Sequence, residues 1–338
     1  MTLAHRMMTR SRRLSTIVSW GLGFFVCLIL PSMGWAEVRE LKVNVGPFDV
    51  NQSPSVTVLT DERFVVGWHE GGPTNCFGRG FSQEGSPLGP QFLLHPPLSA
   101  WKYGPALAPL PDGGYVAFFG WSFGVLGQRF DDGFNQVGGL VDWAPIGEAW
   151  PVIAALANGD IVVVGDHQFA PYPVIARRYN PSLVPYGPPR QVNISPPGER
   201  LFTSAVAGAP NGNYTVAWYT LGGDIIARTF DASDTPLTDE FFVNSSLGGR
   251  RFAPSLAYNS KNELVIAWHG SGAEDSAGIY ARRFLSDGTP LDSEWQVNET
   301  TAGSQHTPNL AIGGNDEIVI SWTSPDASGS GVFARLYN

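Results

Sequence analysis

Short apolar segments separated by turn residues repeat along the chain from about residue 41 to its end. The segment 264–268 reads Leu-Val-Ile-Ala-Trp, so an extended strand there is apolar on both faces. Such a strand has no solvent side and lies inside a structure. The turns that precede these segments contain Gly, Asn and Asp, which supply positive φ in hairpins, as in Pro111–Gly114, Ala157–Asp160 and Pro210–Asn213. The pattern predicts β-strands joined by tight turns.

One unit of roughly fifty residues occurs six times. Residues 254–268 align without a gap with residues 308–322, from the first Pro through the turn to the Trp. Fourteen residues after its start, each unit has an aromatic residue, except the third, which has Gly165. The starts are Pro54, Pro105, Pro151, Ser204, Pro254 and Pro308. A period of this length indicates stacked or radial repeats.

Each unit predicts four strands, and the fourth ends in Val-Asn, as at Val192-Asn193, Val243-Asn244 and Val297-Asn298. The last unit stops after its third strand, whereas residues 41–44 near the start read Leu-Lys-Val-Asn. If this segment completes the last sheet, a ring closes and two exposed edges disappear. We therefore predict an all-β, six-bladed β-propeller of four-stranded antiparallel blades, closed by its N-terminal strand.

The fifth unit resembles a known repeat. Gly278–Phe284, Gly288–Leu291 and Glu294–Asn298 are similar to the roughly fifty-residue β-propeller repeats of large bacterial secreted and adhesin-like surface proteins, and all six units fit that pattern over residues 41–338. The resemblance implies a secreted bacterial scaffold without an established set of catalytic residues. Related repeats are often associated with calcium-binding modules, but the sequence has no Asp-x-Asp-x-Asp-Gly loop, so calcium is not implied here.

The first 36 residues have the pattern of a signal peptide. Four arginines, at positions 6, 10, 12 and 13, precede the apolar run 17–30, and Gly34 and Ala36 are the small residues that signal peptidase accepts. We predict cleavage after Ala36, which leaves one domain, 37–338, secreted to the periplasm or the exterior without a membrane span. The alternative is a retained anchor, although the run is shorter than the roughly 20 residues that cross a bilayer.

Composition supports the β prediction and excludes some partners. Gly 40 and Pro 27 are high, and charged residues reach only 15%, against about 25% in average soluble proteins, so long solvated helices are not expected. The predicted cleavage removes four of the 21 basic residues and none of the 30 acidic ones, which brings the net charge near −13. Such a charge disfavours nucleic acid as a partner.

Position in the repeat separates scaffold from candidate site. A residue that recurs in every blade serves the blade, whereas a residue that occurs once in a shared slot is free to bind a ligand. One slot of the third strand holds an arginine in five units and Gln128 in the second, so we expect it to be structural. These arginines are Arg79, Arg177, Arg228, Arg282 and Arg335.

The sequence varies most in the connections from second to third strand and from fourth strand to the next blade. In antiparallel blades these connections share one face, which we call the variable face. The residues before each innermost strand should ring the mouth of the central channel there. The predicted ligand-binding residues are Trp101, Lys102, Tyr103, Glu148, Trp150, Arg200, Phe202, Arg250, Arg251 and His306. Aromatic surfaces beside charges suit sugar rings or a protein edge. Alternatively, Trp150, Phe202 and Phe252 plug the channel.

No catalytic residue is predicted. Four histidines, at positions 69, 167, 269 and 306, share the variable face without metal-ligand spacing, so we expect no metal and no cofactor. The Ser-x-Asp-x-Gly-x-Thr-Trp turns of sialidases are absent. The sequence favours a non-enzymatic binding or scaffolding propeller that recognises a glycan or an extracellular protein. The alternative is an extracellular polysaccharide hydrolase or lyase that uses carboxylates such as Glu70, Glu148, Asp166 and Glu274 at the channel mouth.

Overall fold

A computed structural model describes most of the chain after residue 40. The described residues are 41–44, 51–70, 75–96, 102–121, 124–143, 150–166, 173–194, 202–245, 249–272, 275–326 and 329–338. The predicted signal peptide lies outside them. Over these ranges, no helix is long and apolar enough to pass through a bilayer.

The described strands form six antiparallel sheets, five with four strands and one with three. Blade 1 contains β1 (Asn51–Val58), β2 (Phe64–Glu70), β3 (Asn75–Phe81) and β4 (Phe92–Leu93). Blade 2 contains β5 (Lys102–Pro109), β6 (Tyr115–Trp121), β7 (Gly124–Phe130) and β8 (Gln136–Asp142). Blade 3 contains β9 (Val152–Ala155), β10 (Ile161–Asp166), β11 (Val174–Tyr179) and β12 (Arg190–Gln191).

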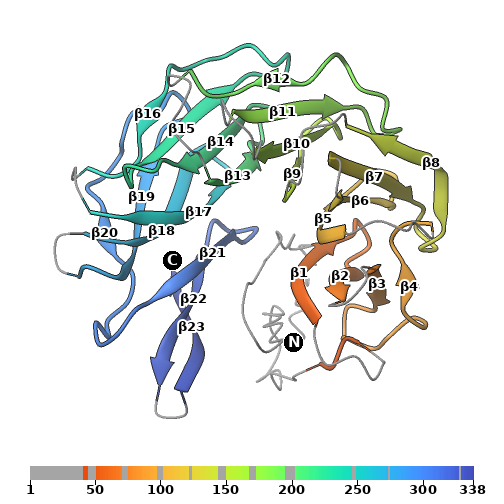
Figure 1. Ribbon diagram of the computed structural model, residues 1–338, viewed down its shortest axis with the longest axis horizontal. Coiled ribbons are helices and arrows are strands. Elements are labelled where there is room, and N and C mark those ends of the chain that lie inside the picture. Colours follow the sequence, from red (N-terminus) through yellow and green to blue (C-terminus); the bar gives the residue numbers. More distant parts are fainter. Residues whose placement is uncertain are drawn as a thin grey trace, which may run out of the picture.

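The second half of the chain continues the series. Blade 4 contains β13 (Phe202–Gly208), β14 (Tyr214–Tyr219), β15 (Ile225–Phe230) and β16 (Phe241–Phe242). Blade 5 contains β17 (Arg251–Tyr258), β18 (Leu264–Gly270), β19 (Gly278–Phe284) and β20 (Trp295–Gln296). Blade 6 contains β21 (His306–Ile312), β22 (Ile318–Asp326) and β23 (Gly329–Tyr337). Within each blade the strands pair in sequence order, and the blades follow one another around an axis (Figure 1). The predicted six-bladed β-propeller is confirmed.

The second strands of blades 2 to 5 are buried between neighbouring blades, as their apolar pattern predicts, whereas β22 of blade 6 is only partly buried. Trp218 of blade 4 packs against Val162 and Val164 of blade 3, and Trp268 repeats this contact against blade 4. Both indoles are fully buried. Complete burial of a side chain of this size contributes about 3 kcal/mol to folding. Blades 2 to 6 each pack in this way on the blade before them, and blade 1 packs on Leu41 and Val43.

The arginine slot is structural, as predicted. Nη1 of Arg228 donates to the carbonyl of Val192 at 2.8 Å, so a third strand is tied to the fourth-strand end of the preceding blade. Arg282 and Arg335 make the same bond to Val243 and Val297. Each guanidinium also lies over the aromatic ring two residues further along its strand. The slot joins neighbouring blades.

The predicted N-terminal closure is not resolved. Among the described residues β23 pairs only with β22, and residues 41–44 form no strand. Val43 nevertheless packs on Trp68 of blade 1, and its carbonyl accepts a bond from Arg79 at 3.0 Å. Val43 thus occupies, against blade 1, the position that Val192 occupies against blade 4. Pairing of this segment with β23 stays a prediction.

Candidate functional site

The innermost strands are distorted where they start on the variable face. In five blades the register with the second strand shifts within the first few residues, which is the signature of a β-bulge. Ser53, Ala253 and Thr307 adopt left-handed φ values of 52°, 48° and 51° there. Such non-glycine conformations cost about 1 to 3 kcal/mol each and concentrate at functional sites. The bulges therefore mark the channel mouth and re-aim its side chains.

The mouth residues of the first three blades meet at one point. A Cβ atom on Gly104 of blade 2 would lie 2.5 Å from the Cβ of Ser53 in blade 1 and 3.1 Å from the indole of Trp150 before blade 3. No other residue type fits at Gly104 without displacing one of these neighbours. Trp150 is half-buried. Its place at the channel mouth stays a prediction.

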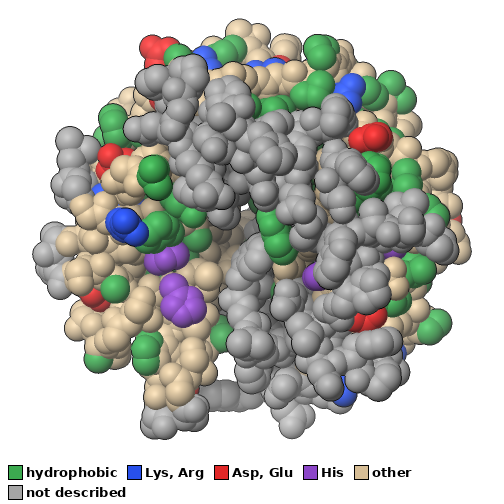
Figure 2. Space-filling model, in the orientation of Figure 1, with side chains coloured by type: hydrophobic (Ala, Val, Ile, Leu, Met, Phe, Trp, Pro, Cys, Tyr) green, Lys and Arg blue, Asp and Glu red, His purple; other side chains and the backbone are tan. Residues whose placement is uncertain are grey.

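Blades 4, 5 and 6 contribute a continuous line of rings, Tyr219, Phe252, His269 and His306, which we call the aromatic row. Tyr219 meets Phe252 edge-on at 5.2 Å between ring centroids, Phe252 lies 5.3 Å from His269, and His269 lies 6.5 Å from His306. All four side chains are half-buried, so each keeps an exposed part. Figure 2 shows two histidine side chains side by side over the region of β18 and β21.

The row follows from the propeller geometry. Phe252 is paired with His269 across β17 and β18, at the start of one strand and the exit of the other. The two contacts between blades join the exit of a second strand to the first residues of the next innermost strand. Because this relation repeats around the axis, residues about thirty positions apart become neighbours. The row lies on the variable face.

His269 is an uncharged member of the row. Burial, and then the neighbouring His306, lower its pKa from 6.5 to about 4. Its Nδ1 atom is buried and has no hydrogen-bond partner among the described residues. A neutral imidazole with part of its ring exposed can stack on a ligand, whereas the buried Nδ1 is not accessible to one.

The structure gives Arg251 a different role from the predicted ligand contact. Its side chain is 1% exposed, and its Nη1 lies 3.5 Å from both the carbonyl of Gly223 and a carboxylate oxygen of Asp224. Asn244 donates to the same carboxylate at 2.9 Å. A guanidinium engaged in this way ties the start of β17 to the loop between β14 and β15 of blade 4, so we exclude Arg251 from the candidate site. Its neighbour Arg250 is exposed.

The other predicted residues are only partly described. Trp101, Glu148 and Arg200 lie outside the described residues. Lys102, Tyr103 and Phe202 are described as backbone at the starts of β5 and β13, opposite the exits of β6 and β14. His306 lies in the aromatic row. The sequence prediction did not include Tyr219, Phe252 and His269. The signal that could have found them is their position, because each lies at the exit of a second strand or at the start of an innermost strand on the variable face.

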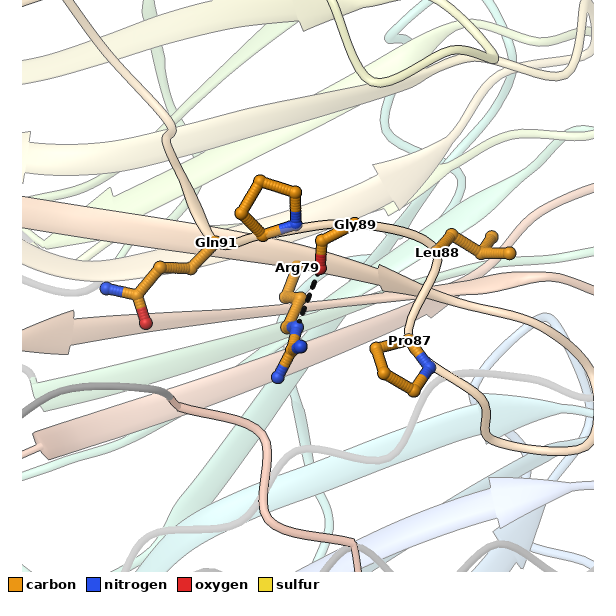
Figure 3. A pocket seen from close by; sticks show the side chains of 6 residues that line it. Arg79, Pro87, Leu88, Gly89 and Gln91 are labelled. Atoms are coloured by element: carbon orange, nitrogen blue, oxygen red, sulfur yellow. Dashed lines mark hydrogen bonds between the residues drawn. The ribbon is translucent and has the colours of Figure 1, made fainter.

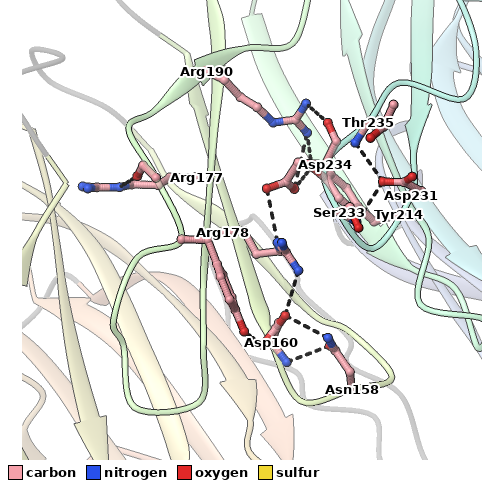
Figure 4. A network of polar contacts seen from close by, with 12 residues as sticks. Asn158, Asp160, Arg177, Arg178, Arg190, Tyr214, Asp231, Ser233, Asp234 and Thr235 are labelled. Atoms are coloured by element: carbon pink, nitrogen blue, oxygen red, sulfur yellow. Dashed lines mark hydrogen bonds and ion pairs between the residues drawn. The ribbon is translucent and has the colours of Figure 1, made fainter.

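The turn face, opposite the variable face, has polar clusters that serve the scaffold. Arg178 bridges Asp160 of its own blade at 2.9 Å and Asp234 of blade 4 at 3.2 Å (Figure 4). Arg190 donates to the backbone carbonyl of Asp234 at 2.7 Å, and Tyr214 donates to its carboxylate at the same distance. The charges of this cluster neutralise one another. The cluster therefore joins blades 3 and 4.

An open pocket of about 570 Å³ lies beside the third-to-fourth turn of blade 1 (Figure 3). It is lined by Arg79 and residues 87–91, and Nε of Arg79 donates to the carbonyl of Gly89 at 3.0 Å within it. Because Arg79 already serves the structural slot, the pocket carries no candidate chemistry. Within the described ranges no group of three histidine, cysteine or acidic residues is placed to hold a metal ion.

Comparison with known proteins supports the fold. No family model and no curated protein sequence match the chain. Its structure is similar to a protein of unknown function from Dyadobacter fermentans, with 14% identity, TM-score 0.58, and coverage of 84% of this chain and 93% of that one. It is also similar to a Penicillium chrysogenum α-L-arabinanase complexed with arabinobiose, with 14% identity, TM-score 0.56, and coverage of 84% and 92%.

A third similar structure is a PL25 ulvan lyase bound to GlcA(1-4)Rha3S, with 10% identity, TM-score 0.55, and coverage of 77% of each chain. At these identities the likeness shows the fold alone. The resemblance to adhesin-like surface repeats therefore stays a prediction.

Proposed function

We propose that the chain binds a polysaccharide at the channel mouth on its variable face. The observation that carries this proposal is the aromatic row, in which half-exposed rings from three blades follow one another. Sugar rings present apolar C–H faces that stack on such rings, while polar groups at the edges orient the hydroxyls. The arabinobiose and GlcA-Rha3S ligands of two similar structures support a glycan over a protein partner.

The test compares glycan binding by residues 37–338 and by two variants, Tyr219→Ala and Phe252→Ala. Stacking of one sugar ring buries roughly 60 Å² of apolar surface, so each variant should lose about 1.5 kcal/mol, or about tenfold in affinity. Phe242→Ala is the matched control, because Phe242 is 55% exposed on the outer strand β16. Titration calorimetry against a panel of soluble plant and algal polysaccharides gives the affinities. Equal binding by all four proteins, or by none, contradicts the proposal.

Cleavage of the bound polysaccharide is the second candidate function, favoured by Glu70. This carboxyl group lies at the exit of β2 on the variable face, and its residue is 9% exposed. Burial raises its pKa, the direction that general acids require. The equivalent residues in four other blades are Trp121, Thr220, Gly270 and Ser324. A carboxyl group that occurs once in this slot is free for chemistry.

The cleavage candidate needs a product assay. If the chain cleaves its ligand, reducing ends or unsaturated sugars accumulate, and Glu70→Gln stops their release while binding persists. Asp326→Asn, at an exposed acidic residue near the end of β22, is the control. Product release that Glu70→Gln leaves unchanged removes Glu70 from the chemistry. Binding without product removes the cleavage candidate and leaves the binding proposal intact.

A further inference from the structure

Two consecutive arginines beside the aromatic row have opposite environments. Arg251 is 1% exposed and paired with Asp224, whereas Arg250 is exposed. Arg250 immediately precedes β17 (Arg251–Tyr258) and lies two residues before Phe252, and alternation along an extended chain would place both side chains on one side.

The backbone of Arg250 is held between two turns of neighbouring blades. Its carbonyl accepts a bond from the Ser271 backbone at 2.9 Å, and the next residue donates to the carbonyl of Gly223 at 3.1 Å. A Cβ on Gly270 would lie 2.0 Å from the Arg250 carbonyl oxygen, and one on Gly223 would lie 2.9 Å from its Cα. Both glycines also have positive φ, +134° and +90°. The position from which this guanidinium projects is therefore fixed.

The acidic groups closest along these turns are already engaged. Asp224 accepts from Asn244 and pairs with Arg251. Asp275 accepts from the backbone of Ala277 at 2.9 Å and from Asn298 at 3.2 Å. Among the described residues the guanidinium of Arg250 has neither an ion pair nor a hydrogen bond. An exposed cation whose backbone is held in place two residues before Phe252 matches a sugar that carries a negative charge.

We infer that the glycan bound at the mouth is anionic, and that Arg250 binds its carboxylate or sulfate while the sugar ring stacks on Phe252. This inference rests on the proposed function and narrows the class of ligand. Arginine forms two parallel hydrogen bonds with either group, so the chemistry is shared and the experiment separates the two sources. Because Arg251 is buried, it holds the loop and takes no part in ligand binding.

The experiment compares probes with matched backbones and different charge. Polygalacturonate is compared with its methyl ester, and dextran sulfate with dextran, against residues 37–338 and the Arg250→Gln and Arg250→Lys variants. Loss of one charge-assisted pair should lower affinity for the preferred anionic probe about tenfold to hundredfold in Arg250→Gln, with a smaller loss in Arg250→Lys. Affinity for neutral probes should not change. Lys261→Gln, at an exposed lysine on the turn face, controls for overall charge.

The outcomes separate the inference from the proposed function. A preference for one anionic probe that Arg250→Gln abolishes supports the inference and identifies carboxylate or sulfate. Equal affinity for charged and neutral probes, or an equal loss in Lys261→Gln, overturns the inference and leaves glycan binding standing. Failure of every polysaccharide to bind overturns both. Because Arg250 is exposed, the melting temperatures of its variants should match that of the parent protein, which checks that the variants are folded.

Discussion

The N-terminal closure can be tested at Asn44, because three other blades show what its side chain should do. Asn244 accepts a hydrogen bond from the backbone of Ile225 at 2.8 Å and is 2% exposed. Asn193 and Asn298 make the same bond to Val174 and Ile279, at 2.9 and 2.7 Å. In each of these three blades the residue whose backbone N–H donates lies three positions before the structural arginine of the third strand.

By this rule the donor in blade 6 is Val332, three residues before Arg335. Val332 is 52% exposed on β23, which pairs only with β22 in the part of the chain that the structure describes, and Asn44 follows Val43 as Asn244 follows Val243. If residues 41–44 form the fourth strand of blade 6, Asn44→Ala leaves the Val332 N–H buried without a partner. The free energy of unfolding should then fall by about 1 to 3 kcal/mol, the cost of one unsatisfied buried donor.

The assay is guanidinium chloride unfolding of residues 37–338 followed by tryptophan fluorescence. Asn193→Ala is the matched control, since it removes the same bond, from the Val174 backbone, where the structure resolves it. Similar losses in both variants support a closed ring. An Asn44→Ala variant within about 0.5 kcal/mol of the parent, beside an Asn193→Ala variant that loses more than about 1 kcal/mol, refutes the predicted register. If neither variant is destabilised, the hydrogen bond accepted by this asparagine does not contribute measurably to the stability of a blade.

Two further predictions concern the mouth. Gly270→Ala should both destabilise the protein and weaken binding of the anionic probe, because the added Cβ would lie 2.0 Å from the Arg250 carbonyl oxygen. A melting curve and a binding titration measure the two effects. An unchanged melting temperature would show that Gly270 does not hold the Arg250 backbone in place. The pKa of His269 is lowered from 6.5 to about 4 in the folded protein, so between these pH values His269 is protonated in the unfolded chain and neutral in the folded one. The free energy of unfolding should therefore fall as the pH drops from about 6.5 to 4, and less so in His269→Gln; parallel pH profiles of the two proteins contradict the assigned pKa.

The architecture could be predicted because the same short apolar and polar pattern specifies the strands and turns of every unit. Each second strand, such as 264–268, is apolar on both faces, and such a strand is stable only between two layers. The recurrence of Arg228, Arg282 and Arg335 in one slot correctly indicated a structural bond. The position of the variable face followed from antiparallel strand order, and the structure places Trp150 near Gly104 and His306 near His269.

The candidate site was predicted less completely, because it depends on contacts between blades. Arg250 and Arg251 are equivalent in the sequence, and only the contact of Arg251 with Asp224 shows that one is buried and the other exposed. The aromatic row joins residues about thirty positions apart, which no local pattern relates. Bulges at Ser53, Ala253 and Thr307 re-aim the mouth side chains, and a left-handed residue of these types leaves no mark in the sequence.

The sequence by itself determined the strands, the turns, the number of blades and which residues serve the scaffold, since these depend on interactions that recur within every unit. Only the tertiary structure decided which side chains meet at the mouth and which charges remain exposed. The physical reason is that the burial of a side chain and its partners depend on the neighbouring blade, and only the arrangement of the blades around the axis brings that neighbour close.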